Sequence, residues 1–198
     1  MTSLTQLSLL DEQTAGLPDG FEYRPGLVSP EDEADLIEAF RVLEFRPFEF
    51  HGFFGNRRTV SFGWHYDFAS SRVRPASDMR CLLPLCDRAA AFARLSPDAL
   101  EHALVTEYAP GAGIGWHRDR PVFDDVIGIS LGAPCRFRLR RKQGNTWQRA
   151  AIELQPRSAY LLRGPVRREW EHSIPPLDKL RYSVTFRSVK QSAKSAAL

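Results

Sequence analysis

Apolar and polar positions alternate in short runs along the second half of the chain. From His102 onward, runs rich in β-branched and aromatic residues are separated by turn-forming stretches such as Pro110-Gly111 and Gln143-Gly144-Asn145. Alternation with a period of two is typical of strands, and short strands at this spacing predict a sandwich or jelly roll. The expected strands cover residues 102–108, 114–119, 126–131, 136–140, 146–154, 158–162, 169–174 and 180–189.

The N-terminal part of the chain shows a mixed pattern. Ser29 and Pro30 are followed by acids and then by apolar residues at helical spacing, which predicts a helix over 30–43. Further elements expected here are strands over 45–50 and 57–62 joined by a turn, an irregular loop over 63–75, and a second helix over 82–95. The expected fold class is therefore α+β, mainly β, with N-terminal helices and a hairpin before an antiparallel core.

These elements divide the chain into four stretches. We expect a loose N-terminal arm over 1–20, an α/β cap over 21–100, the β core over 101–190 and a flexible tail over 191–198. Residues 21–190 are expected to form a single domain, because a chain of 198 residues suits one core with an extension.

Composition is that of a soluble globular protein, with 43% hydrophobic and 26% charged residues. No apolar run approaches the ~20 residues of a membrane span, and the N-terminus lacks the features of a signal peptide. Cys81, Cys86 and Cys135 form no Cys-x-x-Cys pair, and their odd number gives no closed disulfide framework. We therefore expect a cytoplasmic monomer that does not bind membranes.

Charge is spread unevenly along the chain. The net charge is +3, but the first 35 residues hold eight acids and one base, which leaves 26 bases and 16 acids in residues 36–198. This excess of bases favours a polyanionic partner, although it is also compatible with plain solubility.

Candidate chemistry centres on His117 and Asp119. On an extended strand these side chains point the same way, so that one imidazole and one carboxylate face one point. They would form two thirds of the 2-His-1-carboxylate triad that holds Fe(II) in non-haem oxygenases. The alternative is a surface hydrogen bond.

His172 is the candidate for the third ligand. It follows Asp119 by 53 residues, which is enough for several strands to carry the chain back to the same place. The alternative is a hydrogen-bonded histidine in the core or at its rim.

A strictly alternating strand follows His172. Arg181, Ser183, Thr185 and Arg187 share one face, and Tyr182, Val184 and Phe186 share the other. Inside a barrel the two arginines would need anions, because an unpaired buried cation is costly, and a dicarboxylate would satisfy both. The alternative is that this face is solvated.

Residues 45–189 resemble the AlkB-like Fe(II)- and 2-oxoglutarate-dependent dioxygenases. The segments that carry the resemblance occur in that family's order. They are 57–68, similar to part of its nucleotide-recognition lid; 107–119, similar to its Tyr-x-Pro-Gly…His-x-Asp segment; 129–133 with Phe137, similar to its Ser-Leu-Gly strand; 170–175, similar to its distal histidine; and 181–187, similar to its Arg-x-Asn-x-Thr-x-Arg signature.

The resemblance implies a double-stranded β-helix in which His117, Asp119 and His172 bind Fe(II), leaving room for 2-oxoglutarate and O₂. It further implies that Arg181 pairs with the distal carboxylate of 2-oxoglutarate, helped by Tyr108 and Ser183, and that Arg187 binds the carboxylate beside the keto group. The implied reaction releases succinate and CO₂ while hydroxylating a C–H bond. On an N-methyl group, this hydroxylation leads to loss of formaldehyde.

The chain departs from the family pattern at three places. Thr106 stands where many members carry Asn beside the keto-acid carboxylate, and Ser183 replaces the Asn between the two arginines. Arg120-Pro121 follows Asp119, where DNA-repair members often carry a base-reading acid.

Two groups of residues are candidates for substrate binding. Phe62, Trp64 and Tyr66 would sandwich a flipped base, or alternatively pack the cap onto the core. Arg136, Arg138 and Arg140 share a strand face and would track phosphates, or alternatively keep an edge strand soluble.

Three functions remain open. The first is oxidative N-demethylation of alkylated bases in DNA or RNA, in alkylation damage repair. The second is an AlkB-like oxygenase acting on a protein or small molecule. The third is a non-enzymatic β-barrel binding module.

Overall fold

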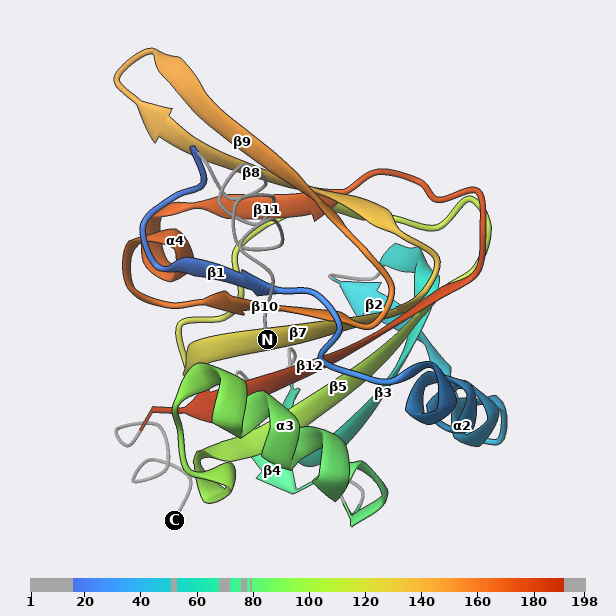
Figure 1. Cartoon of the computed structure of the whole chain (residues 1–198). Coiled ribbons are helices and arrows are strands. Elements are labelled where there is room, and N and C mark those ends of the chain that lie inside the picture. The colour runs from blue at the N-terminus through green and yellow to red at the C-terminus, as the bar shows by residue number, and fades with distance from the viewer. Residues whose placement is uncertain (1–15, 51–52, 68–71, 76–77, 79, 191–198) are drawn as a thin grey trace, which may run out of the picture.

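Two antiparallel sheets face each other in the computed structural model, which describes residues 16–50, 53–67, 72–75, 78 and 80–190 (Figure 1). The larger sheet has the order β1-β10-β7-β12-β5-β3-β2, with β4 paired to β3, and the smaller has the order β6-β11-β8-β9. The strands are β1 Phe21–Arg24, β2 Arg46–Phe50, β3 Phe53–Asp67, β4 Arg72–Pro75, β5 Leu100–Tyr108, β6 Ile114–His117, β7 Phe123–Gly132, β8 Cys135–Gln143, β9 Thr146–Leu154, β10 Ser158–Leu162, β11 Glu171–Ile174 and β12 Arg181–Val189.

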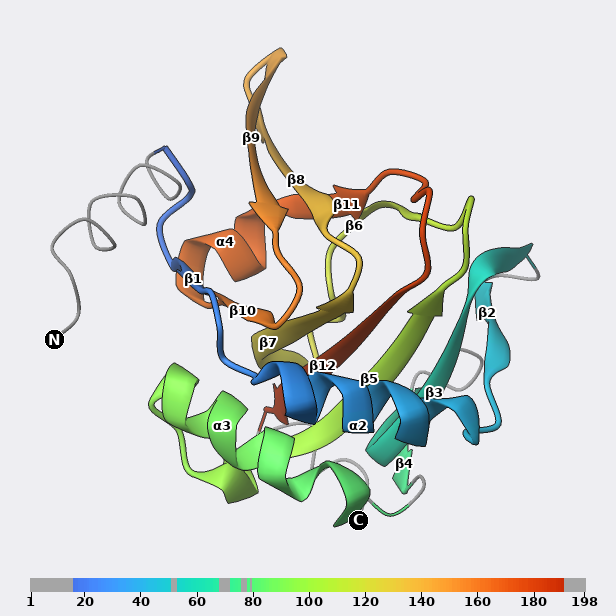
Figure 2. The same ribbon diagram turned by 45° about the vertical axis from the view of Figure 1, so that its right-hand side comes forward.

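Helices α2 and α3 cover the outer face of the larger sheet, and α4 lies beside β11 (Figure 2). The α-helices are α2 Pro30–Arg41, α3 Leu83–Ala93 and α4 Gly164–Glu169, and the 3-10 turns are η1 Arg80–Leu82 and η2 Pro97–Ala99. Helix α2 begins as its sequence predicts, because the Ser29 hydroxyl accepts a 3.0 Å hydrogen bond from the Asp32 amide. The confirmed fold class is thus a mainly β jelly roll with N-terminal helices.

Strand β12 separates two cores. Tyr182, Val184 and Phe186 pack with α2 and α3 on one side. On the other side lies a second apolar cluster, to which both sheets contribute residues such as Phe137 and Tyr160. The arginine face of β12 points into this second space, so the alternative of a solvated face is excluded: Arg181 is 1% exposed and Arg187 is 9% exposed.

The structure corrects several expected boundaries. Residues 63–67 continue β3, and Trp64–Asp67 pair with β4, so this part of the predicted loop is a hairpin; residues 51–52, 68–71 and 76–77 lie outside the described residues. Pairing with β4 supplies the backbone hydrogen bonds here, and the side-chain periodicity of 63–67 does not reveal it. Gly63, with φ +72°, lets β3 approach β5 so closely that a Cβ would lie 2.2 Å from the Glu101 carbonyl oxygen.

Two further elements, β1 and α4, were missed by the sequence analysis. The stretch 1–20 was read as a loose arm, and the first strand after it, β1, pairs with β10 at the edge of the larger sheet. Helix α4 occupies 164–169, immediately before β11, where only a strand from 169 was expected. Strands β3 from the predicted cap and β5 from the predicted core are hydrogen-bonded neighbours, so both stretches build one sheet.

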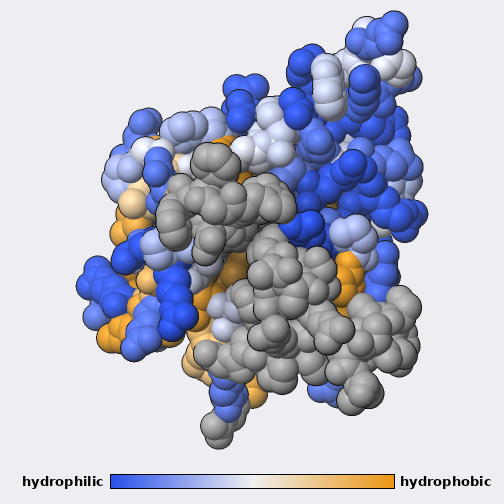
Figure 3. Space-filling model, turned by 180° about the vertical axis from the view of Figure 1, so that it is seen from behind, coloured by the Kyte–Doolittle hydropathy of each residue, from blue (hydrophilic) through white to orange (hydrophobic). Residues whose placement is uncertain are grey.

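The hairpin of β8 and β9 projects from the body at the top of Figure 1. From behind, this hairpin is mainly hydrophilic (Figure 3). Within the described residues, no helix combines the length and apolar character needed to cross a membrane.

Candidate metal centre

Three side chains with nitrogen or oxygen donors meet at the inner face of the smaller sheet. His117 on β6 lies opposite His172 on β11 in the antiparallel register, and the centroids of their imidazole rings are 4.2 Å apart. The Oδ2 atom of Asp119 lies 3.6 Å from Nε2 of His172. The structure therefore brings together the three residues nominated as iron ligands.

Asp119 reaches the site from a loop and not from a strand, because β6 ends at His117. The loop is held by Arg167 of α4, whose buried guanidinium donates to the carbonyl oxygens of Asp119 at 3.2 Å, Arg120 at 2.7 Å and Phe123 at 2.8 Å. Sequence reasoning missed Arg167, since it lies in a short helix that the alternation pattern does not predict.

Burial controls the protonation of the three side chains. It lowers the pKa of His172 to about 3, with a further lowering by His117 that Asp119 opposes. It also lowers the pKa of His117. Burial alone would raise the pKa of the Asp119 carboxyl, but Arg187, His172 and His117 hold that pKa below its ordinary value. At neutral pH the set is two neutral imidazoles and one carboxylate, the states in which these groups bind metals.

The backbone orients His117. Its Nδ1 lies 2.9 Å from the carbonyl oxygen of Gly115. A carbonyl only accepts, so Nδ1 carries the proton and donates, and Nε2 keeps its lone pair for a metal.

Arg187 occupies one oxygen of Asp119. Its Nε and Nη2 lie 2.9 Å and 2.8 Å from Oδ1 of Asp119, and its Nη1 lies 3.3 Å from Nδ1 of His102, which is buried. His102 is a second residue that sequence reasoning missed. It holds Arg187, which in turn holds the candidate ligand Asp119.

As the side chains stand, no three His, Cys, Asp or Glu side chains among the described residues have the geometry to bind a metal ion.

Arg181 lies in a buried polar cluster beside this centre. Its guanidinium lies 5.1 Å from the centre of the Tyr108 ring, and its Nε donates to the Ser130 hydroxyl at 3.1 Å. Its Nη1 is buried without a hydrogen-bond partner among the described residues. Thr106 and Ser130 flank Ser183 on the neighbouring strands, and all three are buried.

These residues fit the groups that the sequence suggested. Two imidazoles and a carboxylate suit Fe(II). A buried guanidinium with an unsatisfied N–H group, next to buried hydroxyls, suits a carboxylate that can accept from all of them. The donor chemistry of the site therefore matches a metal ion with an anionic cosubstrate.

The candidate substrate-binding residues lie on β3 and β8. Phe62 is 4% exposed and belongs to the core under the helices, which favours packing for this residue. Trp64 and Tyr66 lie on β3, but their side chains are outside the described residues. Arg136, Arg138 and Arg140 lie on β8 of the smaller sheet.

A model of the 2OG-Fe(II) oxygenase superfamily matches residues 20–187, a span that includes the candidate metal centre and Arg181. The chain belongs to this superfamily. The AlkB-like resemblance inferred from the sequence is confirmed, because two curated relatives of the oxygenase carry AlkB-family names.

One relative is the alkylated DNA repair protein ALKBH8 homolog of Arabidopsis thaliana, which is 31% identical over 93% of this chain and 59% of its own length. Another is the alpha-ketoglutarate-dependent dioxygenase AlkB of Salmonella typhimurium, which is 32% identical over 52% of this chain and 50% of its own length. The oxygenase thus spans only half to three fifths of these relatives.

The fold is shared with a solved structure, that of OsALKBH1. The two superpose with a TM-score of 0.68 over 87% of this chain and 98% of the other, at 17% identity. At that identity the likeness supports only the fold of the chain, which is a jelly roll.

Proposed function

We propose that the chain is an Fe(II)- and 2-oxoglutarate-dependent dioxygenase that removes N-alkyl groups from bases in DNA or RNA. The observation that carries the oxygenase part is the buried, incompletely paired Arg181 beside the converging His117, Asp119 and His172. A buried cation without an anion is costly, so the site is built for an anionic ligand next to a metal.

In this proposal, His117, Asp119 and His172 hold Fe(II). Arg181 pairs with the distal carboxylate of 2-oxoglutarate. Arg187, which now bonds Asp119, pairs with the carboxylate beside the keto group.

Three hydroxyl side chains near Arg181 complete this arrangement. Tyr108, Ser183 and Thr106 supply hydroxyl groups around the cosubstrate. When bound, iron and 2-oxoglutarate supply the oxidation of a substrate C–H bond, with release of succinate and CO₂. The protein contributes ligand geometry, orientation and exclusion of water.

Two observations support a nucleic acid as the substrate. The relatives named above include a DNA repair protein of the AlkB family. The projecting β8–β9 hairpin, residues 135–154, contains six basic residues and a single acidic one, Glu153. Such a surplus of cations suits a phosphodiester chain. Monomeric state and cytoplasmic location stay predictions.

The experiment uses the full chain loaded with Fe(II) without oxygen and then given 2-oxoglutarate, O₂ and methylated single- and double-stranded DNA and RNA. Mass spectrometry follows succinate and methyl loss together, with unmethylated oligonucleotides and the Asp119→Ala chain as controls. We expect methyl loss with equimolar succinate. Succinate formation that no oligonucleotide stimulates would contradict the nucleic-acid part and favour a protein or small-molecule substrate.

A further inference from the structure

The outer face of the smaller sheet carries interleaved cations and aromatic rings. Since His172 lies opposite Leu139 and faces inward, the neighbouring positions Glu171, Arg140 and Trp116 face outward. We call this surface the arginine–tryptophan face; it consists of Trp116, Arg136, Arg138, Arg140, Lys142, Trp147 and Arg149.

Arg140 lies between two indole rings at the centre of this face. Its guanidinium carbon is 4.4 Å from the centroid of Trp116 and 4.3 Å from that of Trp147. Its Nε donates to Glu171 at 2.6 Å. The guanidinium carbon of Arg138 also lies over the Trp116 ring, 5.1 Å from its centroid. These contacts hold flat cationic and aromatic groups in fixed orientation, while Trp147 stays 36% exposed.

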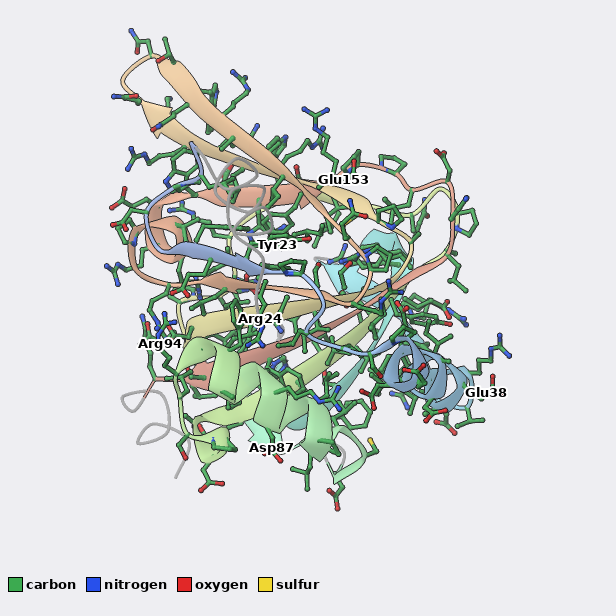
Figure 4. The ribbon with its side chains drawn as sticks, in the orientation of Figure 1. Tyr23, Arg24, Glu38, Asp87, Arg94 and Glu153 are labelled. Atoms are coloured by element: carbon green, nitrogen blue, oxygen red, sulfur yellow. The ribbon has the colours of Figure 1, made fainter. Side chains whose placement is uncertain are left out.

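The charge of the face is not balanced by its own residues. Across the β8–β9 ladder, Arg140 lies directly opposite Arg149, a like-charge pair in which only Arg140 has a carboxylate partner among the described residues. The acids that share the face are Glu171, already paired with Arg140, and Glu153, opposite Arg136 at the body end of the hairpin (Figure 4).

Protection of a sheet edge explains only part of this charge. Edge protection places charges on the unpaired strand, which is β9 in the smaller sheet and carries Arg149. Arg138 and Arg140 lie where β8 pairs with both β9 and β11, so edge protection does not explain these two cations. Their position between two paired strands points to a ligand.

We propose that the arginine–tryptophan face binds a single-stranded polynucleotide, with phosphates on Arg136, Lys142 and Arg149 and a base stacked on Trp147. Cations supply the phosphate contacts, and an exposed indole offers a plane that only an unpaired base can cover. As a site for the substrate strand this rests on the proposed function. Because His117 and His172 project from the opposite face of the same sheet, the surface would hold nucleotides away from the reacting base.

The test is fluorescence anisotropy of the full chain with labelled, unmethylated oligo-dT and oligo-U of about 15 nucleotides at several salt concentrations. Trp147→Ala should raise the Kd by about 5- to 100-fold through loss of stacking. Arg136→Gln with Arg149→Gln should reduce the salt slope by about one per lost phosphate contact. The matched control is Arg41→Gln on α2, an exposed arginine outside this face whose removal should change neither quantity.

Several outcomes overturn the inference. Unchanged affinity and salt slope in both face variants would do so, as would equal competition by duplex DNA or by polyglutamate, which would show a general anion surface. If the variants lose oligonucleotide binding but the wild type demethylates nothing, the binding face is supported and the proposed function is contradicted. If both variants bind oligonucleotides and demethylate them with wild-type KM, the proposed function is supported and the binding face is contradicted.

Discussion

Replacing Arg181 by Met separates the cost of burying this cation from its use in binding. The guanidinium is 1% exposed, and its Nη1 is unpartnered among the described residues. In the protein without cosubstrate the substitution removes a buried charge, which is stabilising, and also the 3.1 Å bond to Ser130, which is worth about 1–3 kcal/mol. We expect these effects to offset each other, leaving the free energy of unfolding within about 1 kcal/mol of wild type.

Cosubstrate binding should respond very differently. Removing one partner of a buried, hydrogen-bonded charge pair costs about 2–5 kcal/mol, so the Kd for 2-oxoglutarate should rise at least ~30-fold. Arg181→Lys keeps the charge but loses the planar fork, and should fall between wild type and Arg181→Met.

Calorimetric titration of 2-oxoglutarate into protein loaded with redox-inert Mn(II) measures the Kd, and urea denaturation measures stability without cosubstrate. Ser130→Ala is the control, since it removes only the partner of Nε. The reasoning fails if Arg181→Met binds 2-oxoglutarate as wild type does. It also fails if the variant alone is destabilised by more than about 3 kcal/mol, because the cation would then be satisfied within the protein.

Three further predictions concern the surrounding structure. Arg167→Met should weaken Fe(II) binding about tenfold or more in competition with a chromophoric chelator, whereas Arg168→Met on the exposed side of α4 should not. Because the pKa of His172 is about 3 when folded and 6.5 when unfolded, the unfolding free energy without metal should fall by up to ~1.4 kcal/mol per unit as pH drops from 6.5 toward 3. In urea titrations, His172→Asn should reduce the dependence of the unfolding free energy on pH. The same dependence in the variant and the wild type would refute the assignment to His172. At pH 8 a disulfide reagent should label exposed Cys81 but not buried Cys86, whose pKa burial raises to about 11, until the chain unfolds.

The sequence predicted best the features that depend only on the alternation of side chains along one strand. The alternation from 181 to 187 predicted which residues share a face, because a period of two leaves no other choice on a strand. It left open whether the arginine face is buried, which the packing of both sheets around β12 decides. It could not predict that Asp119 sits on a loop, since that loop is fixed by Arg167 from a distant helix. Nor could it predict the stack of Trp116, Arg140 and Trp147, which depends on the register of three strands.

The proposed function requires one centre in which three side chains would hold iron and two arginines would hold its cosubstrate. Equilibrium dialysis without oxygen, in the presence of 2-oxoglutarate, tests it by measuring Fe(II) bound to wild type and to the His117→Ala, Asp119→Ala and His172→Ala chains. We predict stoichiometric iron in the wild type and its loss from each variant. Iron that stays stoichiometric in these variants would contradict the assignment of the site.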